Sequence, residues 1–551
     1  MEKAPDESCL FVMFGATGDL MRRKLLPALF QLAEDGLLPA RYQILGVARE
    51  PGMDDARFRR WVRQALADAG LAHGKGPRRW CEDCLHFDTV GDGGAADYQA
   101  LAARIALIEA THALSGNRLL YMALPPQAFP GTIAALARAG LAHSQGWTRL
   151  VIEKPFGHDL ASARRLNALV HRHFGEAQVY RIDHYLGKET VQNLLAFRFG
   201  NALFESAWNR EHIKSVQITV AEALGIGHRA AYYERAGALR DIVQNHITQL
   251  LTLTAMEVPA AFDAESIRHE KVKVLRSVLP IGRDAVVFGQ YAAQRIPSED
   301  AARHIPPGDA APPILSDSAA RPIPSGNAPC TADTARRSNA DETAPPRRSR
   351  SKSGAADAAP AARLLAYREE PGVAADSTAE TYVALRLSIE NWRWQGVPFY
   401  LRTGKRLARR MTQIVIEFRG PPVALFRGID CSPPHTNRLA INLQPDEGFT
   451  LSFEVKSPGN SYALQTRHMQ FRYAEAFGAS LSAGYETLLL DVLEGDQTLF
   501  VHADETEASW RLFTPLLRRH AVREPYAAGS WGPAAADRLI AVAGGAWNNE
   551  P

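Results

Sequence analysis

The chain has 551 residues, 46% of them hydrophobic and 22% charged, which is the composition of an ordinary globular protein long enough for two domains. Its 63 Lys and Arg against 60 Asp and Glu leave a net charge of only +3, which excludes the strongly basic surface of a nucleic-acid or membrane-surface protein. With five cysteines, no signal-peptide pattern at its start and no apolar run that could cross a bilayer, we expect a cytoplasmic protein with neither nucleic acid nor membrane as partner.

Apolar strands alternate with helical segments in the first third of the chain. Near-continuous apolar runs stand at residues 9–14, 42–48, 118–124 and 149–153, with Ala- and Leu-rich stretches between them. Strands of this kind are buried on both faces, which is typical of a parallel sheet with helices on either side. We therefore predict a doubly wound α/β domain over residues 7–184.

A glycine-containing turn joins the first predicted strand to the first helix. In "FVMFGATGDL", Gly15 permits a tight turn, and Gly18 allows the backbone to approach a pyrophosphate at the helix N-terminus. The spacing is G-x-x-G rather than the full G-x-G-x-x-G, so a plain glycine turn stays an alternative. The position of the turn after the first strand favours a dinucleotide site.

The residue after the second predicted strand indicates which dinucleotide would bind. An NAD enzyme usually has an Asp or Glu there, which accepts a hydrogen bond from the ribose 2′-hydroxyl. This strand ends "GVARE", which places Arg49 at the turn. A guanidinium suits a 2′-phosphate, so we predict NADP. Glu50 leaves NAD open, because its carboxylate could accept from a ribose hydroxyl instead.

Two polar stretches follow the last strands of this domain. "VIEKPFGHDL" places Lys154 at the carboxyl end of a buried strand, the edge of a parallel sheet at which ligands bind. "RIDHYLGKE" then leads into a helix with Lys188 in its first turn, where a cation opposes the helix dipole. That cation is reasonable if an anion binds there with His184 and Tyr185. We therefore predict a phosphate pocket with a carboxylate beside it.

A third stretch, "GALRDIVQNHITQLLTL", has apolar residues at helical spacing, and His246 lies on the same buried stripe. Most such histidines are core residues satisfied by a hydrogen bond. A buried imidazole facing a carboxylate is also the usual arrangement of a general base. The spacing does not separate these two interpretations.

The rest of the chain has another pattern. Apolar and polar residues alternate at 215–223, 381–391, 413–419 and 438–456, which favours an antiparallel sheet with one wetter face. We predict a larger α+β domain for substrate binding and oligomerisation over residues 185–551.

A segment at about 295–362 interrupts this second domain. No aromatic residue stands between Tyr291 and Tyr367, and the segment is rich in Ala, Pro, Ser and Arg. Because it offers little apolar surface, we predict a disordered insertion. Its basic run, 347–352, could bind nucleic acid or act as a localisation signal, although a solvated loop is the preferred interpretation.

Taken together, the stretches "GATGDLMRRKLLPALF", "VIEKPFG", "YRIDHYLGKETVQNLL", "GALRDIVQNH" and "VPFYLRTGKRL" resemble the glucose-6-phosphate dehydrogenase family. The resemblance covers nearly the whole chain apart from the insertion. It implies a Rossmann domain followed by a large antiparallel sheet with helices. It also implies oxidation of glucose 6-phosphate at C1 with reduction of NADP+, the first oxidative step of the pentose phosphate pathway, in a homodimer or homotetramer without a metal.

The same resemblance implies roles for individual residues. His246 matches the general base and Asp183 the carboxylate that orients it. Matched to contacts of the sugar or its phosphate are Lys154, His184, Tyr185, Lys188, Glu222, Asp241 and Lys405. Matched to the cofactor are Gly15, Thr17, Gly18, Asp19, Lys24 and Arg49, together with Lys154. A catalytically silent relative, acting as a regulatory or assembly subunit, is the competing hypothesis, although neither His246 nor Asp183 is lost.

Overall fold

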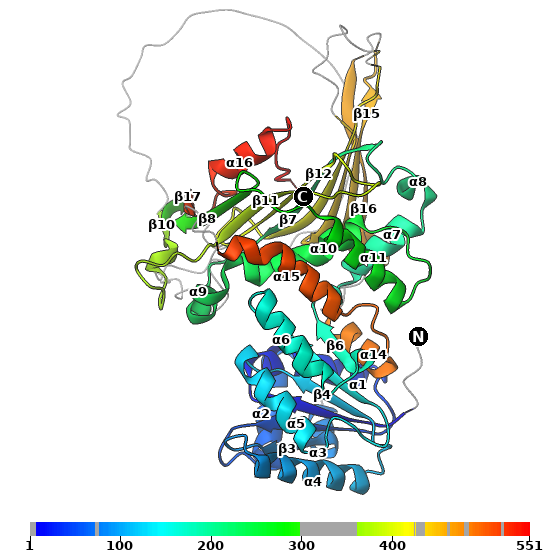
Figure 1. The fold of residues 1–551 in the computed structure, drawn as a ribbon, viewed down its shortest axis with the longest axis vertical. Helices are drawn as coiled ribbons and strands as arrows, with labels where there is room; N and C mark the ends of the chain where they lie inside the picture. Colours follow the sequence, from blue (N-terminus) through cyan, green and yellow to red (C-terminus); the bar gives the residue numbers. More distant parts are fainter. Residues whose placement is uncertain are drawn as a thin grey trace, which may run out of the picture.

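A computed structural model describes residues 7–71, 76–297, 303, 361–423, 425, 436–459, 463–478, 484–518 and 523–550 (Figure 1). Most of the predicted insertion lies outside the described residues. Its two ends, β9 (Gln294–Pro297) and β10 (Ala361–Leu364), pair as an antiparallel two-stranded sheet. The predicted limits at about 295 and 362 fall within these two strands.

The first domain is built on a six-stranded parallel sheet in the order β3-β2-β1-β4-β5-β6. Every pair in it is parallel, which confirms the predicted α/β class. The strands are β1 (Cys9–Phe14), β2 (Tyr42–Ala48), β3 (Leu85–Thr89), β4 (Arg118–Met122), β5 (Thr148–Glu153) and β6 (Val179–Ile182).

Helices cover both faces of this sheet (Figure 1). They are η1 (Met21–Leu25), α1 (Leu26–Glu34), α2 (Asp55–Asp68), α3 (Gly76–Cys84), α4 (Ala95–Thr111), η2 (Pro126–Ala128), α5 (Phe129–Arg138), α6 (Leu160–His171) and η3 (Glu176–Gln178). Alternate residues of β1 belong to two separate cores: Leu10 and Val12 pack in one, Phe11 and Met13 in the other. This division explains why the strand sequence is apolar throughout.

The second domain is built on a nine-stranded sheet in the order β16-β15-β14-β13-β7-β12-β11-β8-β17. Its strands are β7 (Ile213–Ala221), β8 (Val286–Ala292), β11 (Tyr382–Ser388), β12 (Pro398–Gly404), β13 (Met411–Phe418), β14 (Arg438–Gln444), β15 (Gly448–Lys456), β16 (Leu464–Arg472) and β17 (Arg523–Ala527). Most pairs are antiparallel, as predicted, but β7–β12 and β8–β17 are parallel. The sequence pattern does not predict these two parallel pairs, because long crossovers join their strands and a pattern does not show which strands meet.

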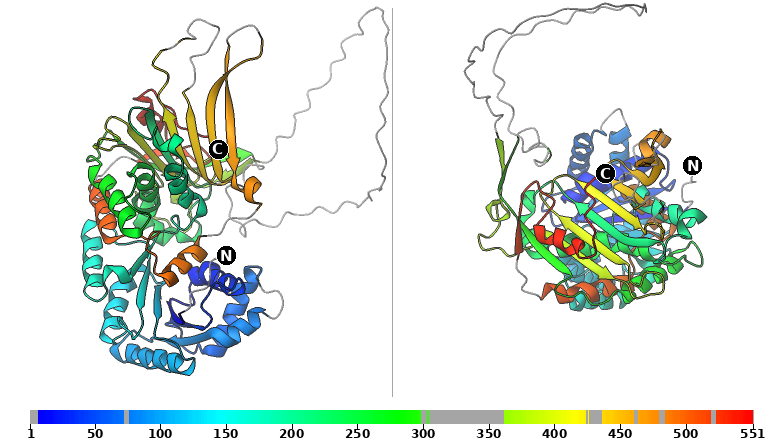
Figure 2. Two further views of the ribbon diagram at one scale, coloured as in Figure 1. Left: turned by 90° about the vertical axis from the view of Figure 1, so that its right-hand side faces the viewer. Right: turned by 90° about the horizontal axis from the view of Figure 1, so that it is seen from above.

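The helices of the second part are α7 (Glu189–Phe199), α8 (Ala202–Glu205), η4 (Gly227–Arg229), α9 (Ala230–Ala238), η5 (Leu239–Ile247), α10 (Thr248–Ala255), α11 (Ala264–Ser277), η6 (Tyr367–Glu369), α13 (Tyr473–Phe477), α14 (Tyr485–Glu494), α15 (Ala503–Leu517) and α16 (Ala534–Ala541). Every residue of α10 is buried, so η5 and α10 form the central layer between the two sheets. Further views show β15 and β16 reaching away from the first domain (Figure 2).

Helix α14 crosses back to the first domain, although it lies near the end of the chain. Its residues Leu488, Leu489 and Val492 belong to the same core as β1 and α1. Arg149, at the start of β5, donates to the carbonyl oxygens of Val492 and Leu493 at 2.6 and 2.7 Å. Among the described helices, none is long and apolar enough to span a bilayer.

Candidate active site

Four of the predicted site residues each follow the carboxyl end of a strand. Lys154 follows β5 and Asp183 follows β6, at one edge of the parallel sheet. Glu222 follows β7 and Lys405 follows β12, and these two strands form a parallel pair in which Ala221 is opposite Gly404. Helix η5, which carries Asp241 and His246, lies between the two groups. The structure therefore brings residues from both domains together.

His246 and Asp183 form a buried pair. Nδ1 of His246 lies 2.5 Å from Oδ1 of Asp183, and both side chains are almost fully buried. Burial alone would raise the pKa of Asp183, but the neighbouring His246 overrides that effect and keeps the pKa well below its usual value. Burial lowers the pKa of His246, and Asp183 partly opposes the decrease. The pair thus combines a neutral imidazole with an ionised carboxylate, and the imidazole can accept a proton at its other nitrogen.

That other nitrogen faces Lys154. The Nζ atom of Lys154 lies 3.0 Å from Nε2 of His246 and also donates to the main-chain oxygen of Asp241 at 3.0 Å. Its distance to the Asp241 carboxylate is 3.4 Å, and the hydroxyl of Tyr232 donates to the same oxygen at 3.0 Å. Because an ammonium donates to Nε2, that nitrogen carries the lone pair of the neutral imidazole and Nδ1 carries the proton. This geometry is what a base that receives a substrate proton requires.

A second ion pair lies on the side of the larger sheet. Nζ of Lys405 is 2.6 Å from Oε2 of Glu222, and the ammonium lies 5.0 Å from the centre of the Tyr233 ring. The Lys405 side chain is 2% exposed, whereas 35% of the Glu222 side chain is exposed. The lysine is thus a fixed charge, and the accessible carboxylate can accept hydrogen bonds from a bound polyol.

A cavity of about 470 Å³ opens next to His184, whose ring meets the imidazole of the His246–Asp183 pair. Its lining combines four cationic or imidazole groups with amide, hydroxyl and carboxyl groups: Lys24, His184, Lys188, Arg410, Thr190, Gln444, Glu189, Glu447 and Tyr485, with Leu20. Burial, together with the neighbouring Arg410, lowers the pKa of Lys188 to about 8. Four nitrogen-bearing groups around one cavity are a suitable receptor for a phosphate dianion.

The start of α7 contributes to this cavity. Lys188 is the residue before the helix, not part of its first turn as predicted, because its backbone is extended (φ −79°, ψ 130°). No side chain in the described part of the chain caps this helix end by a hydrogen bond. The N–H of Val191 donates to the main-chain oxygen of Lys188 at 2.9 Å, so those of Glu189 and Thr190 are the first-turn groups that an anion could use. The Lys188 ammonium stands over the Tyr185 ring at 4.0 Å.

Tyr185 packs against the His246–Asp183 pair and is not among the residues that line the cavity. Its ring stacks on His246, with centroids 4.2 Å apart and planes 18° apart, and its hydroxyl lies 3.4 Å from Oγ1 of Thr412. Its main-chain N–H donates to Oδ1 of Asp183 at 3.0 Å. Tyr185 thus contacts both members of the pair and restricts the orientation of the His246 ring.

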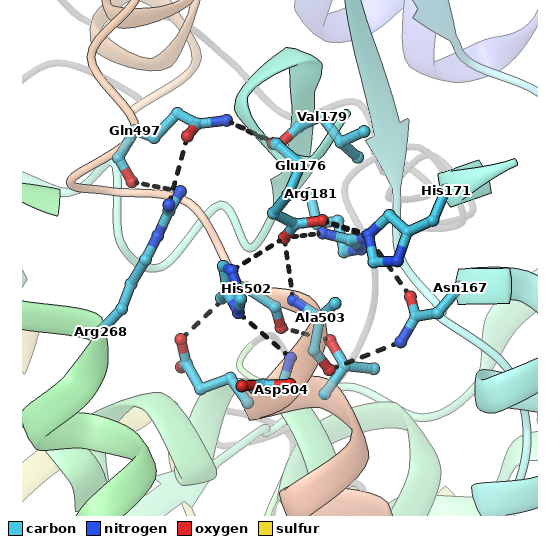
Figure 3. A network of polar contacts seen from close by, with 12 residues as sticks. Asn167, His171, Glu176, Val179, Arg181, Arg268, Gln497, His502, Ala503 and Asp504 are labelled. Atoms are coloured by element: carbon cyan, nitrogen blue, oxygen red, sulfur yellow. Dashed lines mark hydrogen bonds and ion pairs between the residues drawn. The ribbon is translucent and has the colours of Figure 1, made fainter. Parts of the chain in front are cut away.

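Arg181, the first residue of "RIDHYLGKE", belongs to a separate polar network with Glu176, His502 and Ala503 (Figure 3). Its guanidinium lies 2.6 Å from Oε1 of Glu176, and the same oxygen accepts from the N–H of Ala503 at 3.0 Å. Gln497 donates to the main-chain oxygens of Glu176 and Val179 at 3.1 and 3.0 Å. This network fixes the chain before α15 against β6 and so holds the strand that ends at Asp183.

The glycine turn has the geometry of a phosphate cradle. Gly15 has φ +80°, and a Cβ there would collide with the carbonyl oxygen of Ala123. The N–H of Gly18 donates to Gly15 O at 2.9 Å, and a Cβ on Gly18 would lie 3.1 Å from that oxygen. Both positions thus favour glycine, as predicted, and leave the start of η1 accessible to a pyrophosphate.

The other predicted cofactor residues are more exposed or lie elsewhere. Arg49 and Glu50 are both exposed after β2, and a Cβ on Gly93 would be 3.1 Å from a guanidinium nitrogen of Arg49. Asp19 pairs with Arg23 at 2.7 Å on the surface, and Thr17 is half-buried in the glycine turn. Lys24 points into the cavity that holds Lys188.

The sequence predicts no metal site, but the structure brings three side chains that can ligate a metal close together. Single ligand atoms of Asp183, His184 and His246 lie within 4.8 Å of one another. In the structure the nearest of these atoms, on Asp183 and His246, bond to each other. The arrangement of the pair is that of a base and its orienting carboxylate.

Comparison with known proteins identifies the family. Residues 12–193 match the family model "Glucose-6-phosphate dehydrogenase, NAD binding domain", and residues 195–306 and 349–548 match "Glucose-6-phosphate dehydrogenase, C-terminal domain". The chain belongs to the glucose-6-phosphate dehydrogenase family. This family comprises NADP-dependent oxidoreductases of glucose metabolism.

Individual relatives are similar in sequence to this chain over nearly their whole length. A glucose-6-phosphate 1-dehydrogenase of Aggregatibacter actinomycetemcomitans is 39% identical over 98% of this chain and 97% of its own. One from Chlamydia muridarum is 38% identical, with the same coverage. A solved glucose-6-phosphate dehydrogenase in complex with its substrate glucose-6-phosphate superposes with a TM-score of 0.80 at 32% identity, over 100% of both chains. The Mycobacterium avium structure gives 0.77 at 30%, over 100% of this chain and 99% of that one.

The sequence did not indicate most of the residues that line the cavity with Lys188. Arg410, Gln444, Glu447 and Tyr485 line the cavity with Lys188 but come from β13, β14 and α14 regions distant in the sequence. Arg410 follows Lys405 closely, so the "GKRLARR" stretch carried a weak signal for it. Nothing in the local sequence marked the other three.

Proposed function

We propose that this chain oxidises D-glucose 6-phosphate at C1 to 6-phospho-D-glucono-1,5-lactone with NADP+, the first oxidative step of the pentose phosphate pathway. One observation carries the proposal: the buried His246–Asp183 pair adjoins His184, which lines a cavity with several cations that suits a sugar phosphate. The phosphate would be held at one end and the anomeric carbon presented to Nε2 of His246. Positioning of this kind is a large part of catalysis.

The base step follows from the geometry. His246 takes the proton of the C1 hydroxyl at Nε2 while the C1–H bond breaks and the C1=O bond of the lactone forms. Asp183, bonded to Nδ1, stabilises the imidazolium that results. The nicotinamide of bound NADP+ accepts the hydride. The imidazolium then returns its proton to solvent, so that one proton leaves per hydride transferred.

Four further side chains would hold the sugar. The Lys154 ammonium, which already reaches Nε2 of His246, is placed to donate to the C1 oxygen as its charge develops. Asp241, Glu222 and Lys405 stand around the same space and supply acceptors and a donor for hydroxyl groups. The pKa of Asp241 is well below its usual value, because Lys154 and Lys405 overcome the effect of burial. It therefore stays an acceptor throughout the working pH range.

The phosphate would be held by the cavity at the start of α7. Lys188, His184 and Arg410 supply charge or N–H donors. Replacing Lys188 with Ala is expected to raise the KM for glucose 6-phosphate roughly 10- to 100-fold with little change in kcat, because one charge-assisted hydrogen bond is lost. Steady-state kinetics checks this, with Lys214→Ala, a surface lysine paired with Glu417, as the control. An unaltered KM would remove Lys188 from the phosphate site.

The pH dependence gives an independent check on Lys188. Because its pKa is lowered to about 8, the ammonium loses its charge as the pH rises through that value. The kcat/KM of the wild type, which reports the free enzyme, is expected to fall as the pH rises above about 8. In Lys188→Ala this alkaline limb is expected to flatten. An identical limb in both proteins would assign it to another group.

The cofactor would extend along the carboxyl edge of the parallel sheet. Gly15 and Gly18 would hold the pyrophosphate and Arg49 the 2′-phosphate, with Thr17, Asp19 and Lys24 nearby. A cavity of about 1020 Å³ opens beside Pro125, after β4, and Pro155, after β5, and this position suits the nicotinamide end.

Replacing Arg49 with Ala tests the cofactor assignment. We expect the NADP+/NAD+ ratio of kcat/KM to fall at least roughly tenfold, because a charge-assisted contact to the 2′-phosphate is lost and NAD+ has no such group. Arg60→Ala, an exposed arginine on α2, is the control. A ratio that stays within twofold of the wild type would favour Glu50 as the residue that contacts the ribose.

The proposed function itself is tested by the absorbance at 340 nm with glucose 6-phosphate and each nucleotide in turn. Turnover supports the proposal, and its absence would favour a catalytically silent subunit. We further propose a cytoplasmic homodimer or homotetramer. The edge of the large sheet supports it, since β16 is mostly exposed, with Met469 on this strand 56% exposed and Phe477, at the end of the following α13, 68% exposed. Sedimentation velocity distinguishes these assemblies from a monomer.

A further inference from the structure

Helix α14 makes close backbone contact with the turn that carries the phosphate ligands. A Cβ placed on Gly187 would collide with the carbonyl oxygen of Gly484 and lie 2.8 Å from Cγ of Leu488. Gly484, just before the helix, has φ +89°, and a Cβ there would be 3.3 Å from His184 O. The space between turn and helix admits no further atoms. A displacement of α14 would therefore be felt directly at His184 and Lys188.

Tyr485, the first residue of α14, extends this contact to side chains. Its ring lies parallel to the His184 imidazole, with centroids 6.3 Å apart and planes 8° apart. Tyr485 is only 8% exposed, yet it lines the cavity together with Lys188 and Arg410. The His184 ring also meets the His246 ring at a steep angle, with centroids 4.5 Å apart and planes 75° apart. His184 is thus held between an aromatic ring of the chain's last third and the general base.

Tyr485 also lies near a buried carboxyl. Burial and the neighbouring Glu153, the residue immediately before Lys154, raise the pKa of the Tyr485 phenol. Tyr121 donates to Oε1 of the same carboxyl at 2.7 Å. Burial raises the pKa of Glu153 to about 7.

We propose that Tyr485 is a positioning residue for sugar-phosphate binding: the packing of its ring sets the orientation of His184. The inference rests on the proposed function, because it concerns the phosphate end of the same site. Tyr485 itself would act through His184, so its loss should weaken capture of the phosphate and leave the proton transfer at His246 intact. The expected signature is a change in KM with little change in kcat.

The test compares variants that remove different parts of the tyrosine. In Tyr485→Leu the KM for glucose 6-phosphate is expected to rise roughly 3- to 10-fold, the value of an aromatic pair, with kcat within threefold. In Tyr485→Phe, which keeps the ring, the KM is expected to stay within twofold. If Tyr485→Leu does not fold, Tyr485→Met fills the same space and should show the same increase. An unchanged KM in the leucine or methionine variant overturns the proposal, as does an equal increase in the phenylalanine variant.

A matched control separates positioning from a loosened helix. Leu493, at the other end of α14, is 4% exposed in the same core but lies about 12 Å along the helix from Tyr485. Leu493→Ala should lower the melting temperature and leave the KM unchanged. If it raises the KM as much as Tyr485→Leu, the effect belongs to helix docking and the proposal fails.

A comparison of free glucose with glucose 6-phosphate distinguishes a failure of this inference from a failure of the proposed function. Free glucose lacks the phosphate, so Tyr485→Leu should leave its slow oxidation, measured as kcat/KM, within twofold of the wild type. An equal loss with glucose and with glucose 6-phosphate would overturn the positioning of a phosphate ligand. A wild type that oxidises neither sugar would refute the proposed function first.

Discussion

His246→Ala is expected to lower kcat by roughly 10²- to 10⁴-fold, the usual contribution of a positioned general base, while the KM for glucose 6-phosphate changes little. The reason is the geometry of the buried pair: Nδ1 is committed to Asp183 at 2.5 Å, so Nε2 is the nitrogen that can accept a proton. The phosphate ligands of the cavity stay in place in this variant. Binding should therefore survive where turnover does not. Steady-state kinetics at saturating NADP+ measures both.

The pH profile strengthens this test. The base works unprotonated, so kcat falls as the pH drops through the pKa of His246. Because burial lowers that pKa, the wild type should stay active below pH 6.5, the ordinary pKa of histidine. His246→Ala should lose this acid limb. His212→Ala, an exposed histidine bonded to Asn209, is the control and should match the wild type. Turnover within fivefold of the wild type in His246→Ala would remove it from the mechanism.

The fold of the first domain was largely predictable from the sequence, because β1, β2, β4 and β5 are mostly buried and their sequences are nearly continuous apolar runs. β3 and β6 were missed, since each is short and contains polar residues. The pairing of β7 with β12 could not be predicted either. Their own patterns fit either direction, and the long crossover between them decides it.

The candidate site was likewise predictable only where local sequence carried the signal. Residues that stand together in one short stretch, such as Asp183, His184 and Lys188, were predicted because a dense polar cluster between packed elements is unusual. The role of His246 stayed open on spacing alone, and its distance to Asp183 settles that the two pair. Tyr485 could not be predicted, because only tertiary packing places α14 against the turn at Gly187. Arg181 belonged to the polar stretch but serves the network behind β6.

Asp183→Asn is expected to lower kcat by roughly 10²- to 10⁴-fold, although the base itself is retained. The amide is nearly the same size as the carboxylate and can still accept from the N–H of Tyr185, so the variant should fold. It cannot stabilise the imidazolium that forms during turnover, and it no longer fixes the tautomer in which Nε2 accepts the proton. The loss is therefore in the transition state, and the KM should change little.

The sign of the pH shift separates this cause from simple damage to the site. Asp183 raises the pKa of His246 against the effect of burial, so removing its charge should lower that pKa further. The acid limb of kcat is then expected at lower pH than in the wild type, even as the plateau falls. A double variant, Asp183→Asn with His246→Ala, should be no slower than His246→Ala alone, because the carboxylate acts only through the imidazole. Additive losses in the double variant, or an acid limb displaced to higher pH, would show that Asp183 has another role.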